Sequence, residues 1–488
     1  MLKRQATVGR AFPIFVGGKP VTTATTLKVF DKYTKQVGYE VSLAGPQEIE
    51  NALQLAHQAA PAMRELPNYK RKEILLYCAA EIQRRQDELL HSLCVEAGKP
   101  LKDARAELGR AYDTFTIAAE EAIRQYGEFL PLDVSVRNPG FTGLVRRFPV
   151  GLISMITPFN FPINLVAHKV APAIAAGCPF VLKPNDVTPV GALLVGDILS
   201  KAGLPDGAFS VLPCKLEDAK KLSTDPRIQV LSFTGSEQVG FALQRGAGRS
   251  KVLLELGGDA ACVVDEGSDV DHVVSRIGFG AFYYAGQSCI SVQRVYAHES
   301  IYEELKQKLV AHVKTLKKGD PFDEDTFVGP LISEDSAKRL ESWVQEAKEK
   351  GGKVLAGGSR DGSVFDPTIL EDVPDSAKLA CEEAFGPICV LHKFSDFKEA
   401  IEQVNNSRFG LQAVPNPGVF TNEWKKAWYA YDKLEVGGVV INDIPSVRVD
   451  AQPYGGIKSS GVGREGLRYT IEEFTEPKIL LTKDLGKL

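Results

Sequence analysis

The chain has 488 residues, of which 44% are hydrophobic and 25% are charged, and its formal net charge is -4. One hydrophobic core does not serve a chain of this length, so we expect two or three domains. The composition is that of an ordinary globular protein, and the slightly acidic balance gives no reason to expect nucleic acid or an anionic membrane as a partner. No apolar run approaches the roughly 20 residues that a bilayer span requires.

The N-terminus and the cysteines bear on the cellular compartment. The first segment, MLKRQATVGRAF, is basic like a transit peptide, but it lacks serine, and the following PIFVGGKP has the pattern of a strand and a turn. None of the eight cysteines forms a C-x-x-C pair, which favours free thiols in a reducing compartment. We therefore expect a cytoplasmic protein. The seven histidines have no metal-ligand spacing, so no metal site is expected.

Helices are predicted for the first part of the chain. Between residues 47 and 126, apolar residues recur at helical spacing in three long stretches. Two short alternating runs follow within 127–148, and Asn138-Pro139-Gly140 joins them. Alternating runs on either side of such a turn predict a β-hairpin.

From residue 150 the pattern changes to short, nearly continuous apolar runs separated by helical stretches. The first series comprises VGLISMITP, PFVLKPN, AFSVLPC, VLSFTG and KVLLELGG. The second comprises AACVVDE, SVQRVYAHE, KVLAGG, ICVLHKFS and VGGVVIN. Strands without polar alternation are typical of parallel sheets that helices cover on both faces. The predicted fold class is therefore α/β, with two doubly wound parallel-sheet domains and a β-hairpin arm.

Three residues could together carry covalent chemistry on a carbonyl group. Cys289 follows the flexible Gly286-Gln287-Ser288 step and could act as a thiolate, although a lone cysteine is more often a buried structural thiol. Glu255 lies between an apolar strand and a Gly-Gly turn, where desolvation would raise its pKa towards that of a general base; the alternative is a solvated strand-end acid. Asn160 lies between two prolines, and this rigid setting would suit a hydrogen-bond donor to an oxyanion. The alternative is an asparagine that only forms a turn.

A glycine-containing turn could bind a phosphate group. FTGSEQVG places Gly235 and Gly240 in a G-x-x-x-x-G turn after the strand VLSF. Backbone amides at the start of the following helix would favour an anion, as in dinucleotide-binding proteins. The turn is neither the G-x-G-x-x-G fingerprint nor a P-loop, so by itself it is a weak indication.

Seven motifs in one order along the chain resemble the signature series of the aldehyde dehydrogenase superfamily. They are TPFNFP, KPN, FTGS with a following Gly, LELGG, GQSC, EEAFGP and PYGGIKSSGVGRE. The resemblance extends from about Phe15 to the C-terminus. It implies an NAD(P)-dependent, non-acylating enzyme that oxidises an aldehyde to a carboxylic acid through a cysteine thiohemiacetal and thioester.

The resemblance also implies roles for individual residues. Cys289 would be the nucleophile, Asn160 and the backbone N–H of Cys289 would form the oxyanion hole, and Glu255 would be the general base. Lys183 and Glu383 would bind the adenine-side and nicotinamide-side riboses. The remaining cofactor residues would be the pyrophosphate turn and an aromatic beside the nicotinamide, namely Gly235, Ser236, Gly240 and Phe385.

Three structural units follow from the same resemblance. They are a nucleotide-binding domain at 1–126 and 149–255, with 453–473 packing nearby, a catalytic domain at 256–445, and an oligomerisation arm at 127–148 and 474–488. The arm would contain the hairpin and a last strand within EEFTEPKILLTKDLGKL. A homodimer or homotetramer is therefore expected.

The residue three positions after Lys183 bears on the cofactor. Asp186 resembles the acidic residue of NAD-preferring relatives, because it would accept hydrogen bonds from the adenosine ribose and repel a 2'-phosphate. Aspartate is shorter than the more usual glutamate. We therefore expect NAD as the cofactor, with NADP not excluded.

Polar residues near the expected substrate tunnel favour a short aldehyde that is hydroxylated or anionic. His168, Tyr283 and Arg448 are too polar for a fatty or aromatic aldehyde, and an arginine suits a carboxylate, phosphate or sulfonate. INDIPSVRVDAQPYGG and GQSCISVQRV resemble the lactaldehyde and non-phosphorylating glyceraldehyde-3-phosphate branches of the family. The alternative for Arg448 is a surface or intersubunit salt bridge.

Two departures from the family pattern stand out. Asp259 in LELGGDA replaces a Lys or Asn, and Val414-Pro415-Asn416-Pro417 interrupts a strand, where two prolines predict a bulge.

The alternative functions are a broad-specificity aldehyde dehydrogenase, a CoA-acylating semialdehyde dehydrogenase and a non-catalytic structural homologue. Acylating members typically lack the glutamate base, and a non-catalytic homologue would have lost Cys289 or Glu255, so both residues argue for hydrolytic catalysis.

Overall fold

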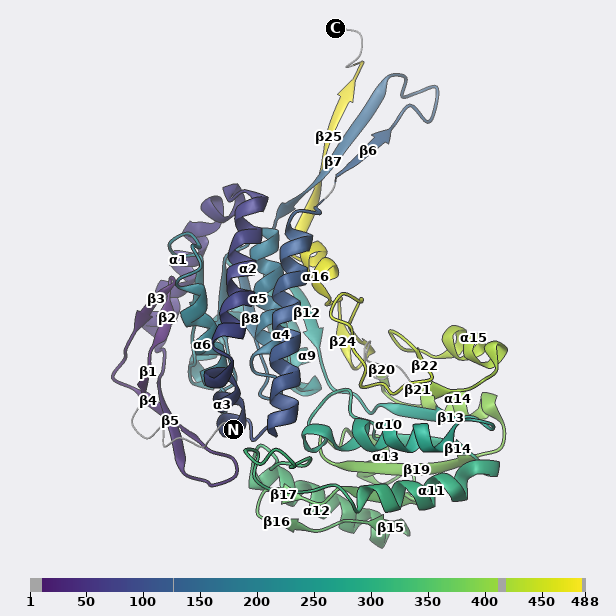
Figure 1. The fold of residues 1–488 in the computed structure, drawn as a ribbon. Helices are drawn as coiled ribbons and strands as arrows, with labels where there is room; N and C mark the ends of the chain where they lie inside the picture. The colour runs from purple at the N-terminus through teal and green to yellow at the C-terminus, as the bar shows by residue number, and fades with distance from the viewer. Residues whose placement is uncertain (1–10, 126, 411–417, 485–488) are drawn as a thin grey trace.

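The computed structural model describes residues 11–125, 127–410 and 418–484. Two α/β units lie next to each other, and a narrow three-stranded arm projects from the first of them (Figure 1). The predicted α/β class with a β-hairpin arm is confirmed. The interruption Val414–Pro417 and the basic residues 1–10 lie outside the described residues.

The predicted helical block consists of four helices. Apolar residues at helical spacing give α4 a buried face that includes Leu108, Ala111, Phe115 and Ala118, and this face contacts α2 and α5. The helices are α1 (Pro46–Glu65), α2 (Asn68–Arg84), α3 (Gln86–Glu96) and α4 (Leu101–Ala122). PIFVGGKP forms the predicted strand and turn, and a second strand, which was not predicted, begins at Lys19.

The first α/β unit is built on an eight-stranded sheet in the order β24-β12-β11-β8-β9-β10-β2-β3. Its five central strands are parallel, whereas β2, β3 and β24 pair antiparallel at the two edges. The strands are β2 (Ile14–Val16), β3 (Lys19–Val21), β8 (Ile153–Ile156), β9 (Phe180–Lys183), β10 (Phe209–Val211), β11 (Val230–Thr234), β12 (Lys251–Glu255) and β24 (Gly461–Val462). All five runs of the first predicted series are central strands.

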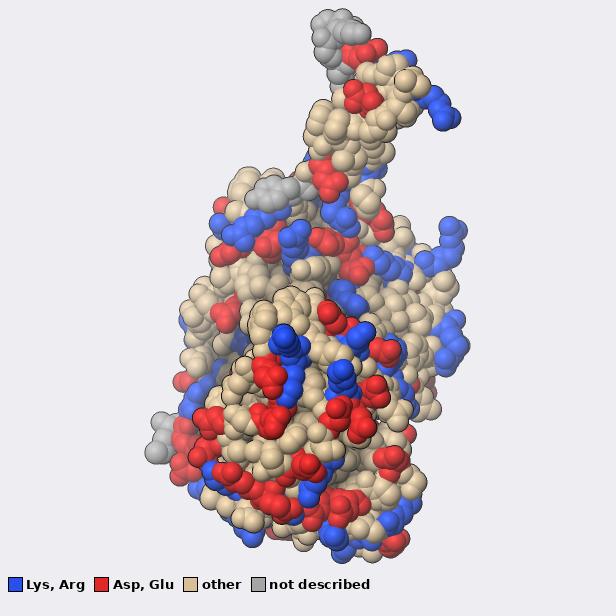
Figure 2. Space-filling model, turned by 90° about the vertical axis from the view of Figure 1, so that its right-hand side faces the viewer, with Lys and Arg blue, Asp and Glu red and all other residues tan. Residues whose placement is uncertain are grey.

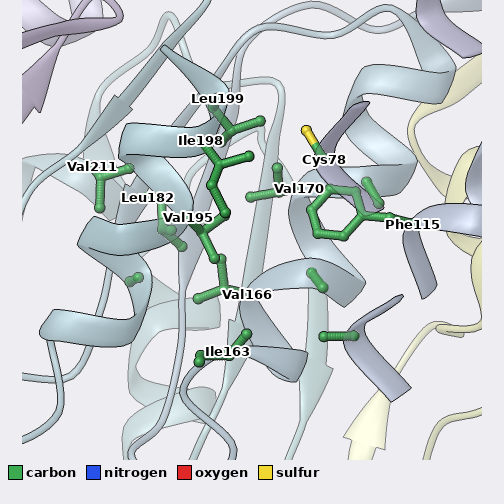
Figure 3. Packing of buried hydrophobic residues seen from close by; sticks show 14 of the residues in the cluster. Cys78, Phe115, Ile163, Val166, Val170, Leu182, Val195, Ile198, Leu199 and Val211 are labelled. Atoms are coloured by element: carbon green, nitrogen blue, oxygen red, sulfur yellow. The ribbon is translucent and has the colours of Figure 1, made fainter. Parts of the chain in front are cut away.

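Helices cover both faces of this sheet. Phe180 and Leu182 belong to the core cluster on one face, whereas Val181 packs on the other face against α1, because successive residues of a strand point in opposite directions. Figure 3 shows the first cluster, in which Phe115 lies among side chains of α5 (Asn164–Ala176) and α6 (Val190–Leu199). Burial on both faces explains why the strands lack polar alternation.

The second α/β unit contains a seven-stranded sheet in the order β15-β18-β19-β14-β13-β21-β22. Its pairs are parallel except at one edge, where β15 is antiparallel to β18, a strand that the sequence patterns did not predict. The strands are β13 (Ala261–Val264), β14 (Arg294–His298), β15 (Lys353–Ala356), β18 (Thr368–Glu371), β19 (Ile388–Phe394), β21 (Gly418–Phe420) and β22 (Val440–Ile441). The helices are α10 (Val270–Phe282), α11 (Glu299–Val313), α12 (Glu334–Glu349), α13 (Lys378–Cys381), α14 (Phe397–Asn405) and α15 (Trp424–Lys433).

The arm is the predicted hairpin extended by the last strand. β6 (Glu128–Pro131) pairs antiparallel with β7 (Phe141–Pro149), which pairs antiparallel with β25 (Thr475–Lys483). The register aligns Thr475 with Pro149 and Lys483 with Phe141. Side chains such as Phe129 and Leu480 are exposed at 68% and 61%. A three-stranded sheet that exposes apolar side chains is expected to find a covering partner.

The surface and the smaller elements complete the fold. A three-stranded sheet of β1 (Ala11–Phe12), β5 (Val37–Ser42) and β4 (Thr26–Phe30) flanks the first unit, and α16 (Leu467–Glu473) packs on α4 and α5. Acidic and basic side chains are interspersed over the face that Figure 2 shows. Within the described residues, no helix combines the length and the apolar character that membrane crossing requires.

Candidate active site

One cavity lies at the carboxyl ends of four neighbouring parallel strands. β8 leads to the Asn160 loop, β9 ends at Lys183, β11 leads to Gly235 and β12 ends at Glu255. All four residues line a cavity of about 1040 Å³, which also reaches Cys289. The carboxyl edge of a parallel sheet is the usual place for a ligand in such folds. The sheet therefore brings together residues that are up to 129 positions apart in the sequence.

A short strained turn places Cys289 in this cavity. Between α10 and β14, a 3₁₀ turn (Tyr283–Gly286) contains left-handed φ angles of 46° at Tyr284 and 53° at Ala285. Gly286 also has a positive φ, and a Cβ there would lie 2.1 Å from the carbonyl oxygen of Gly386. Only glycine allows this approach. The turn that precedes the thiol is thereby packed against the loop containing Glu383 and Phe385.

The thiol of Cys289 is partly buried and faces the cavity. Its Sγ lies 3.5 Å from the hydroxyl oxygen of Tyr454. Burial raises the pKa of the Cys289 thiol to about 11, and the hydrogen bond with Tyr454 partly opposes this shift. The free protein therefore holds Cys289 mostly as the neutral thiol near neutral pH. The pKa of each of the other buried thiols Cys78, Cys178, Cys214, Cys262 and Cys389 is likewise raised, but none of these five lines the cavity.

Asn160 is aimed at the segment before the thiol. Its side-chain Nδ2 donates a hydrogen bond to the carbonyl oxygen of Gln287 over 3.2 Å. Its Oδ1 is buried and has no hydrogen-bond partner among the described residues. The amide group thus has donor hydrogens near the cysteine loop and lies on the cavity wall, as an oxyanion donor requires.

Glu255 is a buried carboxyl group with unused hydrogen-bonding capacity. Only 5% of the residue is exposed, and within the described chain its Oε2 has no hydrogen-bond partner. Burial raises its pKa well above the usual value, and the nearby carboxylate of Glu465 raises it further, against the opposing charges of Arg448 and Lys169. Gly455 leaves room beside the group, since a Cβ there would lie 3.0 Å from Oε1. A carboxyl group in this state can act as a general base once it is deprotonated.

The other end of the cavity offers groups suited to a dinucleotide. Lys183 donates a hydrogen bond from Nζ to Asp186 Oδ1 over 2.7 Å. Ser236 occupies the N-cap position of α9 (Glu237–Gly246), but its hydroxyl forms no hydrogen bond to the backbone N–H groups of the first turn. These N–H groups are therefore available for an anion. Glu383 accepts a hydrogen bond from the backbone N–H of Gly258 over 3.0 Å, and burial raises its pKa to about 7.

An aromatic pair and a buried glycine complete this end. Phe385 lines the cavity with a φ of 46°, and its ring meets Phe159 edge to face at 5.7 Å. Gly240 does not line the cavity. A Cβ on Gly240 would lie 2.4 Å from Leu256, so this glycine allows α9 to pack closely on the segment after β12. Phosphate, ribose and ring sites in one cavity with a thiol fit a nicotinamide dinucleotide.

Of the three predicted substrate residues, one lines the cavity and the other two do not. Arg448 lines the cavity, and its guanidinium group lies 3.4 Å from the ring centroid of Tyr454. Its Nε lies 3.5 Å from Asp450 Oδ1, and only 4% of its side chain is exposed, so it forms no surface salt bridge within this chain. His168 and Tyr283 do not line the cavity. They lie behind it.

His168 and Tyr283 each form a hydrogen bond with a residue that lines the cavity. His168 Nε2 lies 2.9 Å from Asp450 Oδ1, and its Nδ1 lies 3.3 Å from Arg448. Tyr283 donates a hydrogen bond from its hydroxyl to Ser288 Oγ over 2.6 Å. Burial lowers the pKa of His168, which keeps the imidazole neutral near neutral pH.

The model of the aldehyde dehydrogenase family matches residues 20–480. The chain belongs to this family. The 3-sulfolactaldehyde dehydrogenase of Priestia aryabhattai is 40% identical over 473 residues, which is 97% of this chain and 98% of the relative. The crystal structure of aldehyde dehydrogenase 21 from Physcomitrella patens, in complex with the reaction product succinate, has a TM-score of 0.96 and 49% identity and covers 98% of this chain and 99% of that one.

A further solved structure shows the cofactor of a relative. The glyceraldehyde-3-phosphate dehydrogenase GapN of Methanocaldococcus jannaschii, complexed with NADP, has a TM-score of 0.89 and 36% identity and covers 94% of this chain and 99% of that one. The protein is therefore an NAD(P)-dependent enzyme of the aldehyde dehydrogenase family that oxidises aldehydes.

Among the cavity residues of this aldehyde dehydrogenase that were not singled out from the sequence are Tyr454, Glu465 and Arg110. Tyr454 and Glu465 lie within the motif PYGGIKSSGVGRE, which therefore carried a signal for them. Arg110 gave no such signal, because it lies in the middle of α4. It reaches the cavity and binds Asp450 through NH2 over 2.6 Å.

The structure also accounts for Asp259, which departs from the family pattern. Its Oδ1 lies 3.2 Å from Arg294 NH2, and its Oδ2 accepts a hydrogen bond from Ser407 over 2.8 Å. Arg294 also donates from Nε to the backbone oxygen of Asp259 over 3.0 Å. The buried carboxylate of Asp259 is therefore paired with the buried guanidinium group of Arg294.

Proposed function

We propose that this enzyme oxidises a short aldehyde that carries a negative charge to the corresponding carboxylate. The carrying observation is the presence of two arginines, Arg110 and Arg448, in the same cavity as Cys289. Both contact the carboxylate of Asp450, and Arg448 also lies 3.8 Å from the carboxylate of Glu465. Glu465 is paired with Lys169 as well, so the three cations exceed these two carboxylates by one positive charge. The relatives support this class of substrate, since one is named for 3-sulfolactaldehyde and another binds succinate, and both compounds are anions.

In the proposed first stage, Cys289 attacks the aldehyde. The thiol releases its proton to water, the Cys289 sulfur bonds to the carbonyl carbon, and the electron pair of the C=O π bond moves to the oxygen, which becomes an oxyanion. The Nδ2 donor of Asn160 and the backbone N–H of Cys289 would stabilise that oxyanion. When bound, the nicotinamide supplies the hydride acceptor, and Cys289 is left as a thioester.

In the second stage, Glu255 would activate water. As the deprotonated carboxylate it takes a proton from water, the resulting hydroxide adds to the thioester carbon, and the C–S bond breaks. The acid leaves, and Glu255 passes the proton that it took from water to the Cys289 sulfur, which restores both the thiol and the Glu255 carboxylate. The burial that raises the pKa of Glu255 suits this role, because the carboxylate becomes a stronger base. Transfer of the acyl group to coenzyme A is the alternative, but it has no need of a base in this position.

Lys183, Asp186, Ser236, Glu383 and Phe385 would hold the dinucleotide, with NAD preferred. Asp186 is 41% exposed at the cavity, where a carboxylate repels an additional 2'-phosphate. Its bond to Lys183 weakens that repulsion, so NADP would be accepted more poorly but not excluded. Measuring kcat/KM with each cofactor decides this point, and a higher value for NADP would contradict it.

We further propose the boundaries and assembly of the chain. The nucleotide-binding domain would span 1–126 and 149–255 with 453–473 nearby, the catalytic domain 256–445, and the arm 127–148 and 474–488.

Free thiols throughout fit a cytoplasmic enzyme. The exposed apolar side chains of the arm fit a homodimer or homotetramer. Sedimentation velocity measures the mass of the assembly, and a monomer at micromolar concentration would contradict this proposal.

A panel of short aldehydes tests the proposed substrate class. Semialdehydes and hydroxyaldehydes with a carboxylate, phosphate or sulfonate should give higher kcat/KM values than neutral aldehydes of the same length, measured as NAD(P)H absorbance. Uniform values across the panel would instead indicate a broad-specificity enzyme. A preference for long apolar aldehydes would contradict the proposal.

Arg448→Gln should lower kcat/KM for anionic aldehydes by about 10- to 100-fold, since a hydrogen bond to a charged group contributes about 1.5–3 kcal/mol. Neutral aldehydes of equal length should lose less than about threefold, because they make no such bond. Arg105→Gln is the matched control. Arg105 lies on α4 like Arg110, but it points to Glu324 at the surface. An equal loss for neutral and anionic aldehydes would show that Arg448 only maintains the fold.

A further inference from the structure

Lys99 is a buried cation that the proposed mechanism does not use. It lies in the short link between α3 and α4, no part of it is exposed, and it does not line the cavity. Its Nζ donates a hydrogen bond to the backbone oxygen of Asn160 over 2.7 Å and a second one to the carboxylate of Glu107. Isolated buried charges are costly, so a fully buried lysine with such specific partners needs an explanation.

Two aromatic rings contact the same ammonium group. Nζ lies 3.8 Å from the ring centroid of Phe161 and 4.2 Å from that of Tyr284. Phe161 directly follows Asn160, and Tyr284 belongs to the strained turn before Cys289. A desolvated cation attracts the faces of aromatic rings. Lys99 therefore contacts both the loop of the oxyanion donor and the loop of the nucleophile.

Residues close to Lys99 in the sequence also accept hydrogen bonds from these two loops. The hydroxyl of Tyr284 donates to the backbone oxygen of Ala97 over 3.1 Å, and its backbone N–H donates to Asp103 over 2.9 Å. Such contacts can maintain the left-handed conformation of Tyr284, which a non-glycine residue rarely adopts.

Glu107 fixes the other loop. Its Oε1 accepts hydrogen bonds from the backbone N–H groups of Ile163 and Asn164 over 2.9 and 3.1 Å. These two residues end the turn that begins at Asn160. The carboxylate of Glu107 therefore holds one end of the turn while Lys99 holds the other.

We propose that Lys99 is a positioning residue that fixes the oxyanion donor Asn160 relative to Cys289. This inference rests on the proposed roles of Asn160 and Cys289. Lys99 sets the position of the Asn160 backbone directly, and it connects that backbone to the cysteine loop through the rings of Phe161 and Tyr284. Neither Lys99 nor Glu107 touches the reacting atoms. Stability alone does not require the pair, because apolar or neutral groups of similar volume often replace a buried ion pair without loss.

The first experiment replaces the ion pair with neutral groups in the full-length enzyme. Lys99→Met/Glu107→Gln should lower kcat by about 10- to 100-fold, because a small misplacement of a catalytic donor has effects of this size. KM for NAD should change less than about threefold, and thermal denaturation and titration of reactive Cys289 should remain those of the wild type. Arg71→Met is the matched control, since Arg71 is also a buried cation that binds the backbone oxygens of Ala175 and Ala176, and none of these residues lines the cavity. An unchanged kcat in the double variant would overturn the proposal.

A double-mutant cycle with Asn160→Ala distinguishes positioning from general damage. If Lys99 acts through Asn160, adding the Lys99→Met/Glu107→Gln changes to Asn160→Ala should cause little further loss of kcat. Multiplicative losses would overturn the proposal. Failure of the proposed function has a different signature, because Asn160→Ala alone would then retain wild-type activity.

A second pair of variants leaves the buried charges intact, in case the ion-pair variant does not fold. Tyr284→Phe keeps the ring against Lys99 and should retain kcat within about threefold, whereas Tyr284→Leu loses the ring face and should lose about tenfold or more. The two variants must first give equal Cys289 titres. Equal kcat values would then overturn the role of the aromatic contact in positioning.

Discussion

Cys289→Ala should abolish aldehyde-dependent NAD(P)H formation, with a loss of at least about a thousandfold, because none of the other seven cysteines lines the cavity. Absorbance at 340 nm with saturating aldehyde and cofactor measures the loss. The variant should still bind cofactor, since the residues proposed for that role lie elsewhere in the cavity. The fold should also persist, because the substitution removes only a thiol.

Cys381→Ala is the control for this experiment. Cys381 is the exposed thiol among the eight cysteines, and it lies on α13, close in sequence to Glu383. Its removal should leave activity intact. If Cys289→Ala kept more than a few per cent of wild-type activity, Cys289 would not be the nucleophile.

Glu255→Gln should separate the two stages of the reaction. Acylation needs no hydrolytic base, so one equivalent of NAD(P)H per active site should form in a burst. The steady-state rate should then fall by about 10²- to 10⁴-fold, which is the usual contribution of a general base. Rapid mixing shows the burst, and mass spectrometry of the quenched protein shows the acyl group on Cys289. A linear trace at the wild-type rate would contradict the role of Glu255.

The pH dependence of the second stage follows from the environment of Glu255. Burial raises the pKa of this group well above its usual value, so the protonated form persists at a pH where an exposed glutamate is ionised. Only the carboxylate can take a proton from water. The deacylation rate should therefore increase as pH rises from neutral into the alkaline range. In Glu255→Gln the remaining slow rate should lack this dependence on Glu255, and an unchanged profile would assign the titration to another group.

The local patterns of the sequence determined the fold class and most of its elements. The five continuous apolar runs between residues 150 and 258 became five central parallel strands, because strands buried on both faces need no polar alternation. The turn Asn138-Pro139-Gly140 and the alternating runs beside it gave the hairpin of the arm. The order of the motifs led to the roles that we propose for Cys289, Glu255 and Asn160. Strand β18 was not predicted, since it contains only two consecutive apolar residues, Ile369 and Leu370, and lacks the longer apolar run of the other strands.

The tertiary structure decided which polar residues line the cavity and which lie behind it. His168 and Arg448 were equal candidates by composition, yet Arg448 lines the cavity and His168 holds Asp450 behind it. Arg110 and Asp450 meet although 340 positions separate them, and no local pattern marks such a pair. The same holds for Lys99, whose partners at Asn160 and Tyr284 come from different loops. Local sequence specifies strands and turns because their interactions are between near neighbours, whereas the side-chain environment of a site depends on packing between distant segments.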